Sequence, residues 1–105
     1  MPSQRLHPDT LLGFHISCVM SRNQFTDDPG PVIEELYATA GDRTDLLSQE
    51  VGQWIGFYEA DHTRTLATAL RALPLDLTEH IAVGQERRMQ PAHGTQGFER
   101  PPGVA

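Results

Sequence analysis

The chain has 105 residues, of which 38% are hydrophobic, and its formal net charge is −6. This length suits a single domain, and the hydrophobic content lies on the globular side of the boundary with disorder. A single cysteine, Cys18, excludes an internal disulfide framework. The acidic charge argues against a nucleic-acid binder, which needs a basic face to neutralise phosphates, and Arg87-Arg88 is the only adjacent basic pair.

The first apolar segment, residues 11–21, fits two structures. Every second side chain from Leu12 to Met20 is apolar, and this alternation favours a strand. A helical face also runs through the segment, formed by Leu12, Ile16, Val19 and Met20. No other segment resembles a strand, and an isolated strand would leave its backbone groups unpaired. We therefore predict a helix, with a strand paired across a dimer axis as the alternative.

The same segment is the best candidate for a membrane or export signal. Its apolar run, from Leu11 to Met20, is well short of the roughly twenty residues that a membrane span requires. His15 interrupts the run, and the residues before it carry Arg5 offset by Asp9, which makes a poor signal peptide. We expect a cytoplasmic protein that does not contact a membrane.

The next segment carries clear helix boundaries. Asp28 offers an N-cap, Pro29 suits the first turn, and Gly41 suits the residue that follows the last turn. Apolar side chains recur between them at helical spacing. A helix is predicted over residues 30–40.

The long stretch from Thr44 to Leu73 is the most informative part of the sequence. Its apolar residues recur at helical spacing: Leu46, Leu47, Val51, Trp54, Ile55 and Tyr58, then Leu66, Leu70 and Leu73. Asp61-His62-Thr63, a run of weak helix formers, separates the two groups. We predict two helices, about 44–60 and 63–73, with a bend between them and with Thr44 or Asp45 as the first cap.

Three small residues stand four apart in this stretch: Gly52, Gly56 and Ala60. A glycine in a helix interior costs roughly 1 kcal/mol relative to alanine, so two of them indicate that another backbone comes close. We take these three residues, with Trp54 beside them, as a candidate helix-packing interface. The partner helix could belong to the same chain or to a second copy.

A last short helix is expected to begin at Asp76 or Thr78, with Leu77, Ile81 and Met89 on its buried side. Residues 90–105 are mostly Pro, Gly, Gln, His and Thr, which predicts a flexible tail. The predicted fold is therefore all-α, a small bundle of four or five short helices over residues 9–89, followed by the tail.

Candidates for chemistry are few. Glu59 and His62 have the Glu-x-x-His spacing of di-iron bundles, but the sequence has no second copy of this motif, so a solvated polar turn is the favoured interpretation. The five histidines show no ligand spacing, and His15 is expected to be partly buried. Cys18 is expected to be a small core residue. No cofactor is predicted.

We expect a small non-enzymatic interaction or regulatory protein that acts through a helical surface on a protein partner that the sequence does not identify. About eighty structured residues give only a few kcal/mol of stability, and oligomerisation is a common supplement, so a homodimer is predicted. Two alternatives remain. One is a metal-dependent or carboxylate–histidine enzyme, and the other is a helix-turn-helix DNA-binding regulator built from the two helices of the long stretch.

Overall fold

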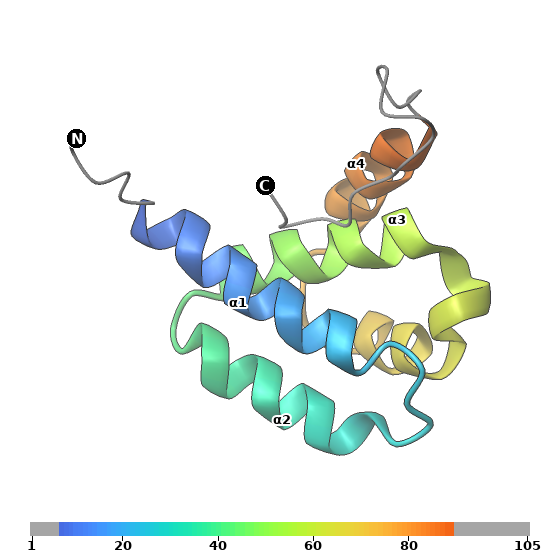
Figure 1. Ribbon diagram of the computed structural model, residues 1–105, viewed down its shortest axis with the longest axis horizontal. Coiled ribbons are helices and arrows are strands. Elements are labelled where there is room, and N and C mark those ends of the chain that lie inside the picture. The colour runs from blue at the N-terminus through green and yellow to red at the C-terminus, as the bar shows by residue number, and fades with distance from the viewer. Residues whose placement is uncertain (1–6, 90–105) are drawn as a thin grey trace, which may run out of the picture.

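The computed structural model describes residues 7–89, without the side chains of residues 59–64. Within this range the chain forms four helices and no strand (Figure 1). The predicted all-α bundle is confirmed, and the tail predicted for residues 90–105 lies outside the described range. The helices are α1 (Pro8–Arg22), α2 (Pro29–Ala40), α3 (Thr44–Arg71) and α4 (Thr78–Met89).

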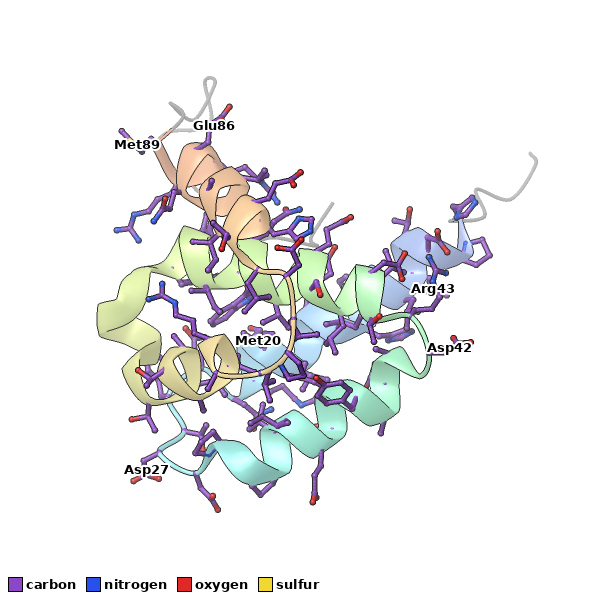
Figure 2. All side chains as sticks on the ribbon, turned by 180° about the vertical axis from the view of Figure 1, so that it is seen from behind. Met20, Asp27, Asp42, Arg43, Glu86 and Met89 are labelled. Atoms are coloured by element: carbon purple, nitrogen blue, oxygen red, sulfur yellow. The ribbon has the colours of Figure 1, made fainter. Side chains whose placement is uncertain are left out.

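The central element of the bundle is α3. The other three helices all pack on it, α1 and α2 also pack on each other, and α4 touches no other helix (Figure 1). One side of α3 joins α1 and α2 in a single core, whose fully buried members include Ile16, Met20, Leu36, Leu47, Val51, Trp54 and Ile55. Burying one such side chain stabilises a fold by about 1.5–3 kcal/mol. Figure 2 shows Met20 inside the bundle, whereas Asp27, Asp42 and Glu86 lie at its edges.

The first two helices form as predicted. α1 is a helix and not a strand, with Ile16, Val19 and Met20 buried on one side. Nδ1 of His7 accepts a hydrogen bond from the amide of Asp9 at 3.1 Å and so satisfies one free donor of the first turn. α2 ends at Ala40 and is followed by Gly41, whose φ of 62° is a conformation that residues with a side chain rarely adopt.

The prediction of two separate helices in the long stretch is wrong. α3 is one helix from Thr44 to Arg71. The predicted bend is present: the ribbon of α3 turns sharply past its midpoint, so that the last turns run back beneath the first (Figure 1). The predicted caps are also wrong: Arg43 occupies the cap position without a side-chain cap bond, and Asp45 instead accepts a hydrogen bond from the Arg43 guanidinium at 3.0 Å.

Two details at the C-terminal end differ from expectation. α3 ends at Arg71, and residues 72–77 lead into α4. Leu77 is buried and Ile81 partly buried, as predicted, but Met89 is 83% exposed. Met89 is the last residue of α4, beyond the part of that helix that α3 covers.

Candidate functional site

Two glycines of α3, Gly52 and Gly56, pack against α4 of the same chain. A Cβ atom at Gly52 would lie 2.5 Å from the Cβ of His80 and 3.1 Å from the carbonyl oxygen of Leu77. A Cβ atom at Gly56 would overlap the carbonyl oxygen of Ile81. The close approach that the sequence indicated is therefore made within one chain, and a second copy is not needed to explain these glycines.

A third glycine, on α4, belongs to the same contact. We call Gly52, Gly56 and Gly84 the glycine seam. Gly84 of α4 is buried, and a Cβ atom there would overlap the carbonyl oxygen of Gln53. Gly84 was not among the residues predicted for this contact. The signal was present, because an interior glycine in an amphipathic helix carries the same cost that marked Gly52 and Gly56.

Two arginines of α4 donate hydrogen bonds to α3 beside the glycine seam. Arg87 donates to the side-chain oxygen of Gln53 at 3.1 Å, and Arg88 donates to the backbone carbonyl of Phe57 at 3.0 Å. Both lie in the last turn of α4, where a cation also favours the helix dipole. The basic pair noted in the sequence thus has a structural role between α3 and α4.

The remaining predicted site residues do not form one site. Trp54 is fully buried in the core, with its ring 4.3 Å from that of Tyr58. The side chains of Ala60, Glu59 and His62 lie outside the described residues, so the metal alternative remains a prediction. Among the side chains that the structure does describe, no three His, Cys, Asp or Glu could hold a metal together. The DNA-binding alternative assumed two separate helices, whereas α3 is one bent helix, and this alternative stays a prediction.

Exposed apolar side chains gather instead on the outer side of α1. Leu11 is 43% exposed and Phe14 is 38% exposed, and Cys18 is half-buried and outside the core, so the prediction of a core cysteine is wrong. Their spacing of three and four residues places them on one side of the helix. His15 is exposed beside them, with its ring 6.2 Å from that of Phe14, so the expectation of a partly buried histidine is wrong. We call these four residues the α1 outer face.

The α1 outer face explains why this segment resembled a strand. The opposite side of α1 buries Ile16, Val19 and Met20. A helix with apolar residues on two sides can show the same alternation as a strand, because both sides contribute to the count. A helix that is apolar in several directions usually packs against more than one neighbour.

The α1 outer face carries no aspartate, glutamate or arginine. Residues 10–21 lack formal charge, and the charged residues at the two ends are tied to other elements. Asp9 accepts a hydrogen bond from Arg43 at 2.8 Å, and Arg22 pairs with Glu35 of α2. The result is an uncharged apolar surface on a chain of net charge −6.

A buried carboxyl group of α3, Glu50, lies against α1 on the side opposite the α1 outer face. Glu50 is 8% exposed, and its Oε2 would lie 3.0 Å from a Cβ atom at Gly13. Its other oxygen, Oε1, has no hydrogen-bond partner among the described residues, and the amide of Gln49 lies 3.4 Å from Oε2. Burial raises the pKa of the Glu50 carboxyl, while Gln49, Arg87 and His80 counteract part of that effect.

Comparison with protein-family models, with curated proteins and with solved structures finds no match for this chain. Across residues 7–89, no helix combines the length and the apolar character that crossing a bilayer would require.

Proposed function

We propose that this protein is a non-enzymatic interaction protein that forms a homodimer through the α1 outer face. The observation that supports this proposal is the pair of exposed apolar side chains, Leu11 and Phe14, on a helix whose other side already contributes to the core. Protein interfaces are depleted in charge at their centre and enriched in aromatic residues. The α1 outer face has both properties.

A second copy suits this face better than an acidic or basic partner. Two chains of net charge −6 repel each other overall, and a contact surface without formal charge adds no further repulsion between like charges. Residues 10–21, which are all of α1 except its two ends, carry no formal charge. In a symmetric pair of antiparallel α1 helices, Phe14 would face its own counterpart near the axis, and Leu11 would approach Cys18 of the other copy.

Sedimentation velocity over a wide range of protein concentration tests the proposal. The wild type should sediment with twice the chain mass of 11.7 kDa. Phe14→Glu should shift the protein to monomer, with a dissociation constant raised about a hundredfold or more, because a dimer would bury an unpaired charge. Circular dichroism should show unchanged helix content, since Phe14 is not part of the core.

Val83→Glu is the matched control. Val83 lies on α4 and is 40% exposed, close to the exposure of Phe14, and its substitution changes the charge equally. This variant should remain dimeric. A wild type that is monomeric at every concentration would overturn the proposal, as would a dimer that Val83→Glu weakens as much as Phe14→Glu does.

A further inference from the structure

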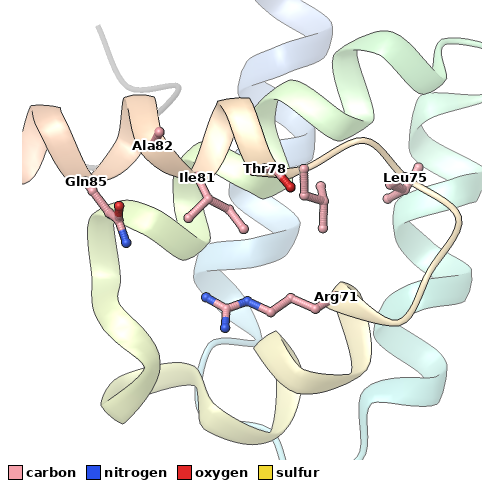
Figure 3. A pocket seen from close by; sticks show the side chains of 7 residues that line it. Arg71, Leu75, Thr78, Ile81, Ala82 and Gln85 are labelled. Carbon is pink, nitrogen blue, oxygen red and sulfur yellow. The ribbon is translucent and has the colours of Figure 1, made fainter.

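A groove of about 490 Å³ opens between the last turn of α3 and the first turns of α4 (Figure 3). Its apolar lining comes from Leu75, Leu77, Ile81 and Ala82. The segment 72–77 joins the two helices along one side of the groove (Figure 3). A volume of this size is in the range of small-molecule sites, which combine an apolar lining with few polar groups. No residue of the α1 outer face lines it.

One guanidinium group lies in this groove. Figure 3 shows the side chain of Arg71 extending from the end of α3 across the groove, toward the side formed by Ile81 and Gln85. Arg71 is in the last turn of α3, where a cation favours the helix dipole. That effect would not require the side chain to cross the groove.

Arg71 also differs from the other arginines with described side chains. Arg22 and Arg43 form ion pairs with carboxylates, and Arg87 and Arg88 donate hydrogen bonds across the seam to α3. For Arg71 the described residues provide neither a hydrogen bond nor an ion pair. Its five N–H donors are therefore available to an anion in the groove.

We propose that this groove binds a small molecule with an apolar body and a single carboxylate, such as a medium-chain fatty acid. The apolar body would lie on Leu77, Ile81 and Ala82, and the carboxylate would accept two hydrogen bonds from Arg71. Gln85 and Thr78 at the rim supply further polar atoms. The inference is independent of the proposed dimer, because the two surfaces share no residue.

The charge of the groove favours one carboxylate over a more highly charged group. Arg71 is the only cation among the lining residues, so it balances one negative charge. The net charge of −6 opposes the approach of a dianion such as a phosphate monoester. The connecting segment beside the groove favours a short molecule over an extended peptide that would need to pass through (Figure 3).

Isothermal titration with octanoate and with 1-octanol tests the site. The two probes share an apolar chain and differ in the charged group. The wild type should bind octanoate at one site about tenfold more tightly than 1-octanol, and Arg71→Gln should reduce this preference to within about twofold. Ala82→Phe should weaken both probes, because the larger side chain would fill the groove.

Arg22→Gln is the charge-matched control, since it removes one positive charge on α1, outside the groove. It should keep the tenfold preference. The proposal is overturned if octanoate binding does not saturate, or if Arg71→Gln keeps the preference for octanoate. It is also overturned if a peptide with an apolar C-terminal residue and a free carboxylate binds more tightly than octanoate, because the ligand would then be a protein terminus.

Discussion

Gly56 of α3 and Ile81 of α4 meet backbone to backbone. A Cβ atom at position 56 would overlap the Ile81 carbonyl oxygen and would lie 2.9 Å from the amide nitrogen of Gln85. Contacts with a flexible side chain can relax by rotation of that side chain, but contacts with a helix backbone require the helix to move. The distance between α3 and α4 is therefore set by the absence of a side chain at this position.

Gly56→Ala should destabilise the protein by about 2 kcal/mol or more, although alanine is the better helix former by about 1 kcal/mol. For a chain of this size the thermal midpoint should fall by about 10 °C. Urea denaturation followed by circular dichroism measures the loss. The effect should come from α4 moving away from α3, and Gly56→Leu should show it more strongly.

Gly30→Ala is the control for a methyl group added outside the contact between α3 and α4. Gly30 lies in the first turn of α2, and, apart from its chain neighbours, the nearest atom to a Cβ there is an Asp28 carboxylate oxygen at 3.9 Å. Pro31 follows it and disfavours a helical residue with a side chain, which offsets the gain in helix propensity, so stability should change by less than about 1 kcal/mol. If Gly56→Ala behaves like Gly30→Ala, the two helices are not held at the distance described here.

Glu50 should make stability fall as pH rises. Its pKa is raised by burial, so the folded protein holds this proton more tightly than the unfolded chain does. The stability that results is complete below the ordinary carboxyl pKa of 4.5 and is lost as pH rises through the raised folded value. Urea titrations at several pH values above 4.5 should therefore show a free energy of unfolding that declines as pH rises.

Glu50→Gln should remove this decline while keeping the shape of the side chain. The free energy of unfolding of the variant should rise relative to that of the wild type as pH increases. Glu34→Gln is the matched control, because Glu34 lies on α2 and is exposed. An identical decline in wild type and Glu50→Gln would show that Glu50 is solvated and ionised in the folded protein.

The ion pairs of Arg43 with Asp9 and Asp45 should make stability fall as pH is lowered, which is opposite to the effect of Glu50. Its hydrogen bonds to Asp9 and Asp45 lower the pKa of both carboxyl groups below the ordinary 3.8. Their contribution to stability is present above that value and is lost as pH falls through the lowered folded values. Arg43→Gln should therefore flatten the acid limb of the stability curve and reduce its dependence on salt, with little change at neutral pH. An acid limb that is unchanged in the variant would rule out this bridge in solution.

Local sequence patterns predict much of the fold. α2 was predicted within one residue at its start, because Pro29 and Gly41 fix a helix at both ends by backbone geometry alone. α1 required an argument about the whole chain, since its alternation fits a helix with two apolar sides as well as a strand. Local patterns determine where helices form more reliably than which neighbour each side of a helix meets.

The features that were not predicted from the sequence depend on contacts between residues that are far apart in the chain. The burial of Glu50 requires the gap that Gly13 leaves on another helix, and nothing near Glu50 in the chain indicates it. The continuity of α3 was missed because Asp61-His62-Thr63 are weak helix formers, and propensity is a weak guide when both flanking segments are packed in the core. The groove of Arg71 appears only once α3 has turned back and α4 has docked (Figure 3).

The glycine seam also determines the register of α4. Gly52 and Gly56 on α3 and Gly84 on α4 leave gaps that accept backbone atoms and little else. A slide of α4 by one turn would bring other side chains into these gaps, so only one docked position is free of overlap. Since α4 touches no helix but α3, it should open and close as a single unit while the core of α1, α2 and α3 stays folded. Amide hydrogen exchange would show this as one common opening rate along α4.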